Sequence, residues 1–121
     1  MTEFFSKIER AGLYIAWEPR GDWHENPEKV EGLCNRLNLI HVVDLMRREP
    51  LSNSSIAYIR LHGLNKKEYD YNYDYSKDEL EQLTQKLHFL TDRHKTVYCL
   101  FNNLNMFKNA LKLKEILNRE Y

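Results

Sequence analysis

Four short and almost uninterrupted apolar segments limit the folds that this sequence can adopt more than any other feature. They cover residues 13–17, 39–43, 56–61 and 97–101, and they are rich in β-branched and aromatic side chains. Continuous apolarity over such short lengths is typical of strands that are covered on both faces, as in parallel sheets. We therefore predict that each segment forms a buried β-strand.

Amphipathic helical patterns lie beside or between these strands. One helix is predicted over residues 4–11, and a second begins at Asn26 and Pro27, because Asn favours the capping position and Pro the first turn. Ser76 and Glu79 match a capping box that opens a third helix. The buried face of a fourth helix is predicted from residues at helical spacing: Met106, Ala110, Leu113 and Leu117.

The predicted order of elements is α-β-α-β-β-α-β-α. Strands that alternate with helices favour a parallel sheet with helices outside it. Residues 45–55 are short and polar, so we predict no helix there, although parallel strands need a crossover of about a dozen residues. Closing a barrel takes about eight strands. We predict a single α/β domain over residues 1–121, namely half of a TIM-type (β/α)8 barrel with four mainly parallel strands and flanking helices.

The composition limits which kinds of partner the chain is expected to bind and in which compartment it is expected to occur. Eighteen basic side chains balance eighteen acidic ones, so the chain lacks the basic surplus of a general phosphate-backbone binder, and nucleic acid is disfavoured. No apolar run approaches the roughly 20 residues of a membrane span, and the N-terminus lacks the layout of a signal peptide. Cys34 and Cys99 are predicted to be reduced, and we expect a cytoplasmic protein.

The histidine and glycine patterns predict neither a metal nor a cofactor. The five histidines lack zinc-ligand spacing, and the sequence has no glycine-rich phosphate loop. His88 and His94 are expected on or just beyond a solvent-facing helix.

Polar residues follow the predicted strands where each strand ends. In parallel β/α folds, ligands bind beyond the carboxyl ends of the strands. Side chains alternate along a strand, so Tyr58, Arg60 and His62 share one face of the third strand, away from the helices. The residues expected to gather at this end are Glu18, Arg20, Asp44, Arg60, His62, Asn102 and Asn103.

These residue types suggest two groups of roles. Candidate catalytic residues that carry protons are Glu18, Asp44 and His62. Candidate ligand-binding residues are Arg20 and Arg60, which fork onto phosphate or carboxylate, and Asn102 and Asn103, which donate to an oxyanion. The same charges would equally suit an ion-pair network that plugs the end of the sheet. The sequence leaves both readings open and specifies no reaction.

Segment 69–75 places a tyrosine at every second position. Such spacing could stack on a base or a sugar, or it could form an extended loop that covers the top of the sheet with its hydroxyls in water. The acidic residues between the tyrosines would repel phosphates, which favours the loop cover.

An ordered set of motifs resembles the YecE-like family, number seventy-two in the series of domains of unknown function. The motifs are Trp-Glu-Pro-Arg at 17–20, Tyr-Ile-Arg-Leu-His-Gly at 58–63, Tyr-Asp-Tyr-Ser at 73–76, Val-Tyr-Cys-Leu-Phe-Asn-Asn at 97–103 and Asn-Ala at 109–110. The resemblance implies a parent (β/α)8-type barrel of about twice this length, of which the chain is the C-terminal half, with a polar mouth and no settled activity. The family usually has small or polar residues after the double Asn; here Met106 and Phe107 are expected to fill a cavity wall.

Two hypotheses about function follow. In the first, the strand ends bind an anionic or sugar-like small molecule through Arg20 and Arg60. In the second, the chain is a non-catalytic half-barrel that pairs with itself as a homodimer, or with a separately encoded N-terminal half. Open sheet edges, which natural proteins seldom leave uncovered, motivate the second hypothesis.

Overall fold

The computed structural model describes residues 14–120. The helix predicted over residues 4–11 lies outside this range. In chain order the elements are β1 (Ile15–Trp17), the 3-10 helix η1 (Gly21–Glu25), α2 (Pro27–Leu37), β2 (Leu39–Val43), β3 (Ile56–Leu61), α3 (Lys77–Arg93), β4 (Thr96–Phe101) and α4 (Met106–Glu120). The predicted α/β class is confirmed.

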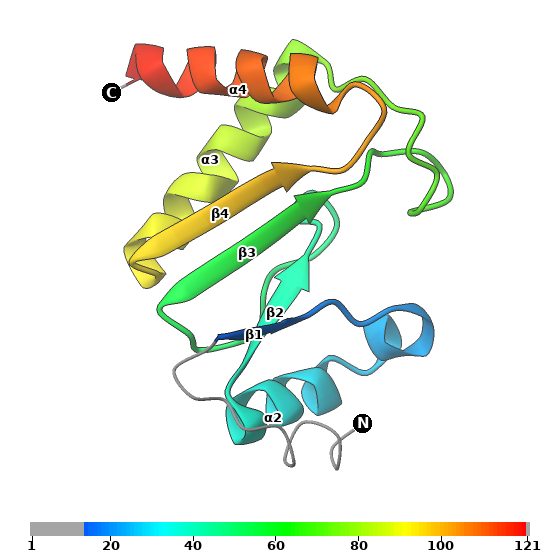
Figure 1. The fold of residues 1–121 in the computed structure, drawn as a ribbon, viewed down its shortest axis with the longest axis vertical. Coiled ribbons are helices and arrows are strands. Elements are labelled where there is room, and N and C mark those ends of the chain that lie inside the picture. Colours follow the sequence, from blue (N-terminus) through cyan, green and yellow to red (C-terminus); the bar gives the residue numbers. More distant parts are fainter. Residues whose placement is uncertain (1–13, 121) are drawn as a thin grey trace.

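The four strands form one sheet in the order β1-β2-β3-β4, and all neighbours run parallel. Figure 1 shows α3 behind β3 and β4, and α2 beside β1 and β2, with no described helix in front of β3 and β4. One face of the sheet is therefore covered by helices, and the other face stays open. β1 and β4 are the two edges.

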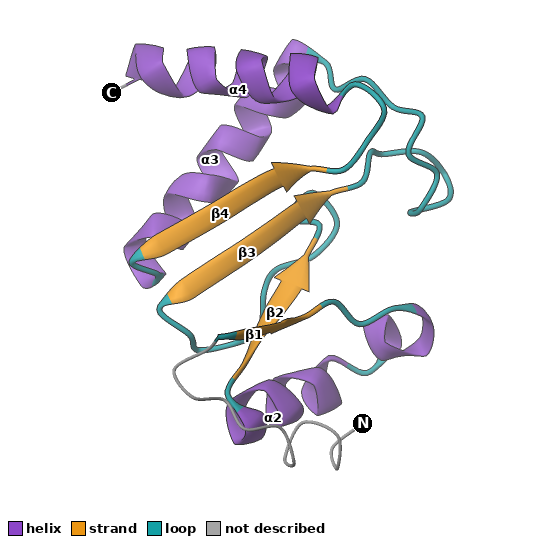
Figure 2. Ribbon diagram, viewed as in Figure 1, coloured by secondary structure: helices purple, strands orange, loops and turns teal. Residues whose placement is uncertain are grey.

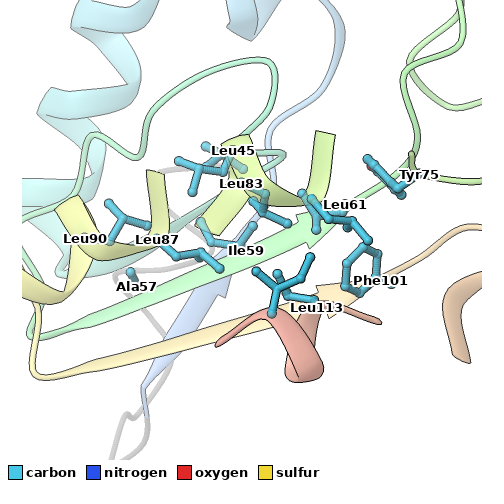
Figure 3. Close-up of a cluster of buried hydrophobic side chains, with 13 residues drawn as sticks. Leu45, Ala57, Ile59, Leu61, Tyr75, Leu83, Leu87, Leu90, Phe101 and Leu113 are labelled. Carbon is cyan, nitrogen blue, oxygen red and sulfur yellow. The ribbon is translucent and has the colours of Figure 1, made fainter. Parts of the chain in front are cut away.

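The larger core lies between the sheet and α3. Ala57, Ile59 and Leu61 alternate along β3 and are fully buried. They meet Leu83 and Leu87 of α3, as Figure 3 shows. Each fully buried aliphatic side chain contributes about 2 kcal/mol through the hydrophobic effect. The side-chain alternation predicted for this strand is confirmed.

A smaller core joins α2 to the first two strands. It contains Trp17, Val30, Cys34 and Leu39. α2 begins at Pro27 as predicted, but the Asn26 side chain does not cap it. Its amide instead donates to the Asp22 carbonyl at 2.9 Å, because η1 brings that carbonyl within reach. Asn26 therefore occupies the N-cap position as predicted, but without a side-chain capping hydrogen bond.

α3 begins with the predicted capping box. Ser76 Oγ accepts from the Glu79 amide at 3.2 Å, and Glu79 Oε1 accepts from the Ser76 amide at 2.9 Å. His94 lies just beyond α3 as predicted, and it is buried. Its Nδ1 donates to the Ser54 carbonyl at 2.6 Å and so ties the end of α3 to the start of β3.

The buried face of α4 agrees with the prediction only in part. Leu113 and Ile116 are buried as members of the larger core, and the polar Asn109 is buried one turn before Leu113. Met106 and Phe107 are 53% and 76% exposed. Leu113 and Leu117 contact the core as predicted, whereas Met106 and Ala110 are exposed. The buried face also includes the polar Asn109, which apolar spacing could not indicate.

The connection from β2 to β3 contains no helix, and Figure 2 draws it as a loop. The Asp44 carbonyl accepts from the amides of Arg47 and Arg48 at 2.9 and 3.0 Å. His41 fixes the later part of this connection to β2. Its main-chain amide donates to Ser52 Oγ and its Nδ1 accepts from the Leu51 amide, both at 3.0 Å. Side chains thus form hydrogen bonds with the main-chain amides of this segment, which in a helix would bond to main-chain carbonyls.

Both cysteines are free thiols, as predicted. Burial raises the pKa of Cys34 to about 11 and, together with the charge of Asp44, that of Cys99 to about 12. Within residues 14–120, no cluster of His, Cys, Asp and Glu side chains is arranged to hold a metal ion. None of the helices described is long and apolar enough to cross a membrane.

Candidate functional site

Glu18 joins the polar groups at the carboxyl ends of the strands. Its Oε1 accepts from Arg60 Nη1 at 2.6 Å, and its Oε2 accepts from His62 Nε2 at 2.7 Å. Arg20 Nη2 lies 3.9 Å from Oε2. Burial opposes the charge on this carboxyl, but the hydrogen bonds and charges of His62 and Arg60 outweigh it and hold the Glu18 pKa below its usual value.

His62 is enclosed completely and orients Glu18. Its side chain is 0% exposed, and the rings of Tyr69 and Tyr71 pack against it with centroids at 5.3 and 5.4 Å. Asn102 Nδ2 lies 3.3 Å from Nδ1, and Nε2 donates to Glu18 Oε2 at 2.7 Å. Both ring nitrogens are engaged within the protein, and the side chain of His62 is fully buried whereas that of Glu18 is 13% exposed.

Asp44 lies beneath the site and supports it. Its Oδ2 accepts from the His62 amide at 3.2 Å, and its Oδ1 accepts from the Met46 amide at 3.0 Å. Arg47 Nε is 3.7 Å from Oδ2. Burial raises the pKa of the Asp44 carboxyl, and the two main-chain hydrogen bonds only partly offset it. The structure places Asp44 as a main-chain anchor, while its role as a proton carrier stays a prediction.

Asn103 does not join the group around Glu18. It is buried, and its Nδ2 donates to the Tyr73 carbonyl at 2.7 Å and to Asn109 Oδ1 at 2.9 Å. Asn103 therefore fastens segment 69–75 to α4. Of the two adjacent asparagines, Asn102 alone contacts His62.

The tyrosine segment forms the roof of the site. Arg20 lies over the Tyr69 ring, with its guanidinium carbon 4.0 Å from the ring centroid. Tyr75 is buried against Phe101, and its hydroxyl accepts from the Gly63 amide at 2.8 Å. The sequence indicated a loop cover but not the contacts of Tyr69 with His62 and Arg20. Tyr69 and Tyr71 pack on His62, whereas Tyr75 belongs to the larger core.

A second ion pair beside the site went unpredicted. Arg48 donates to both carboxylate oxygens of Glu68, at 2.6 and 2.7 Å. His24 Nε2 lies 3.2 Å from the Tyr69 hydroxyl. Burial opposes the charge on Glu68, but Arg48 outweighs it, and the Glu68 pKa falls below its usual value. Since Arg48 and Glu68 belong to irregular segments, neither strand nor helix periodicity could have paired them.

The net charge of the open part of the site is positive. Two guanidinium groups, Arg20 and Arg60, share the single carboxylate of Glu18. Their side chains are 49% and 34% exposed, whereas that of Glu18 is 13% exposed. Guanidinium groups with free donors recognise phosphate and carboxylate oxygens. The arrangement can therefore attract an anion next to two tyrosine rings.

Solved structures show the same fold in longer proteins. A DUF72 family protein from Thermotoga maritima is 26% identical, with a TM-score of 0.75 over 97% of this chain and 51% of its own. A DUF72 family protein from Enterococcus faecalis is 21% identical, with a TM-score of 0.72 over 90% of this chain and 50% of its own. The chain thus spans about half the length of these structures, as predicted for half of a barrel. No curated protein matches the sequence.

The family comparison agrees with the motifs at the strand ends. The model of the family described as "Protein of unknown function DUF72" matches residues 1–121. This match confirms the resemblance drawn from the ordered motifs. The chain therefore belongs to the DUF72 family, whose function is unknown.

Proposed function

We propose that the chain binds a small anionic or sugar-like molecule at the carboxyl ends of its strands. The observation that supports this most is the pair of partly exposed guanidinium groups, Arg20 and Arg60, around the one carboxylate of Glu18. A sugar phosphate would satisfy both parts of the site, because its phosphate would contact the arginines and its ring would lie near Tyr69 and Tyr71.

The binding geometry is held in place by the protein. Glu18 is fixed by His62, whose main chain is fixed by Asp44. Arg60 is held by Glu18, and Arg20 lies against Tyr69. Groups ordered before binding lose less conformational entropy when a ligand arrives, which favours affinity.

The test is thermal unfolding with ribose 5-phosphate, glucose 6-phosphate, inorganic phosphate and glucose. A ligand at about 100 times its Kd stabilises the folded state by about 2.7 kcal/mol, which is a measurable rise in melting temperature. We expect a rise with at least one of the phosphates, and Arg60→Ala should abolish it. Arg93→Ala, which removes an exposed arginine at the end of α3, is the matched control and should preserve it. If none of these compounds shifts the wild-type protein, the proposal fails.

A second candidate function is assembly with another half-barrel. The open sheet face carries exposed apolar side chains: Tyr14 is 65%, Tyr98 51% and Leu100 42% exposed. Tyr58 extends this face, because its ring centroid lies 6.0 Å from that of Tyr98. In the solved relatives, a further half of the chain lies outside the region that this chain matches. A second set of parallel strands would cover the face and pair with both edges.

Solution mass, measured by light scattering, tests this assembly. We expect a mass of twice 14.6 kDa, and Tyr98→Glu should shift the protein to monomer because it places a charge in the contact. Phe89→Glu alters an exposed aromatic residue on α3, outside the open face, and should leave the mass unchanged. A stable monomer with rapid amide exchange along the outer edges of β1 and β4 would rule out self-association.

A further inference from the structure

A cavity of about 330 Å³ lies on the helix-covered side of the sheet, next to the Arg48–Glu68 ion pair. It is bounded by η1, the start of α2 and the loop that follows β2. Its apolar lining comes from Trp23, Pro27, Val30 and Leu51. The Trp23 ring is held by an edge-on contact with Trp17, with centroids 5.1 Å apart. The volume falls at the lower end of the range typical of small-molecule sites, which is about 300–1,000 Å³.

His41 gives this cavity a polar group whose hydrogen-bonding role is fixed. It lines the cavity and is only 3% exposed. Its Nδ1 accepts from the Leu51 amide, so the proton of the neutral ring is on Nε2. Burial, with the charges of Arg48 and His24, lowers the pKa of His41 to about 4, which keeps the ring neutral near neutral pH. Within residues 14–120, the hydrogen bonds of His41 use its main-chain amide and Nδ1, and Nε2 is not one of the fully buried atoms that lack a partner.

The charges around the cavity favour a neutral occupant. Arg48 lines it but is neutralised by its two hydrogen bonds to Glu68. His24 also lines it, and burial and the charge of Arg48 lower the pKa of His24. The exposed Glu49 adds a negative charge at the rim. An anion would meet Glu49 without a free cation opposite, and a cation would meet the donor of His41.

We propose that this cavity binds a small neutral molecule with a flat apolar body and a carbonyl or amide oxygen, which accepts a hydrogen bond from His41 Nε2. The apolar body packs between Trp23, Pro27 and Leu51. The hydrogen bond from His41 Nε2 to the ligand oxygen fixes the orientation of the ligand in the apolar cavity. This site is independent of the anion site proposed at the strand ends, because His41 points to the helix side of β2.

Three compounds with the same ring test the chemistry: benzamide, benzoate and benzylamine. Saturation-transfer NMR titrations of the wild-type protein should give benzamide a Kd of about a millimolar, as expected for a ligand of this size. Benzoate and benzylamine should bind at least about fivefold more weakly. Saturating ribose 5-phosphate should not displace benzamide, which separates this cavity from the strand-end site.

Two variants locate the binding. Leu51→Trp, in a loop, fills the cavity and should weaken benzamide binding at least about tenfold. His41→Gln keeps an acceptor for the Leu51 amide and a donor for the ligand and should retain binding, whereas His41→Leu should lose it. If His41→Leu does not fold, Leu51→Trp decides the question alone. The proposal is overturned if benzamide does not bind, if benzoate binds more tightly, or if Leu51→Trp binds as the wild type does.

Discussion

At the scale of single residues, Glu18 determines how the strand ends are arranged. Arg60 and His62 reach it from the end of β3, and Arg20 from the segment after β1. Strand alternation predicted that Arg60 and His62 share a face, and the positions of the strand ends predicted that Glu18 would lie near them. Alternation could not show that both nitrogens of His62 are engaged, because that depends on Asn102 and on the packing of the loop above.

The charge of Glu18 should make stability depend on pH in a defined window. Its pKa in the folded protein lies below the ordinary value of 4.5. The carboxylate therefore contributes stability above about pH 4.5, and this contribution disappears as the pH falls through the lower folded pKa.

Glu18→Gln tests this dependence. At about pH 7 the variant should be less stable by about 1–3 kcal/mol, because two charge-assisted hydrogen bonds lose their acceptor charge. The difference from wild type should shrink toward zero in acid. Urea unfolding at a series of pH values measures it, with Glu81→Gln, an exposed site on α3, as the control that shows no such trend. An unchanging difference down to strong acid would show that Glu18 is not ionised in the folded protein.

At the scale of elements, the sequence was informative where apolarity was continuous and less so where polar groups are buried. β2 and β3 begin and end where predicted, and β1 and β4 differ from the prediction only at their first residues. The buried face of α4 was predicted only in part, at Leu113 and Leu117. Asn109 was missed because it is buried through its hydrogen bonds to Tyr75, Asn103 and Asp74. η1 was missed because no periodicity marks so short a helix.

Asn109→Ala should destabilise the protein by about 2–3 kcal/mol. The Tyr75 amide and Asn103 Nδ2 both donate to the buried Asn109 Oδ1, and the substitution leaves both donors without this acceptor. Chemical denaturation measures the change. Asn118→Ala, at an exposed position of the same helix, should change stability by less than about 0.5 kcal/mol. Equal effects at the two positions would show that the buried amide network does not stabilise the fold.

Alanine substitution at Gly63, in the loop that leaves β3, can be compared with the same substitution at Gly32, inside α2. Gly63 has φ +99°, and a Cβ there would lie 2.5 Å from Tyr73 Cβ, whereas a Cβ on Gly32 meets nothing within 4 Å. Gly63→Ala should cost about 2–4 kcal/mol and loosen the tyrosine segment. Gly32→Ala, inside α2, should add about 1 kcal/mol because alanine favours the helix. Thermal unfolding of both variants measures the two opposite shifts, and a stable Gly63→Ala protein would contradict the tight packing of Tyr73.

At the scale of the whole molecule, two separate cores share one sheet. The core around Ile59 has thirteen buried members within residues 14–120, and the core around Cys34 has four. The strand β1, which belongs to the smaller core, has only three residues. The inequality follows from the lengths of the elements, because β1 has three residues and α2 eleven, whereas β3 has six and α3 seventeen.

Thiol labelling under increasing urea should therefore modify Cys34 before Cys99. Cys34 belongs to the smaller core, and Cys99 packs against the larger one. In the absence of urea, both thiols should react slowly near about pH 8, because their pKa values are about 11 and about 12. Mass spectrometry after short labelling pulses resolves the order. Simultaneous labelling would mean that the two cores unfold as one cooperative unit.

The loop between β2 and β3 has a consequence for how this chain tolerates change over evolution. A helix distributes its hydrogen bonds along its own main chain, so that most of its side chains can be replaced without altering its path. Here the path depends on three positions, Asp44, His41 and Ser52, which together satisfy the amides of the loop and of the strand beside it. Substitutions should accumulate freely at exposed positions such as Glu49 and Asn53, while those three positions can change only together. Homologous chains with a helix at this point are expected to lack this trio.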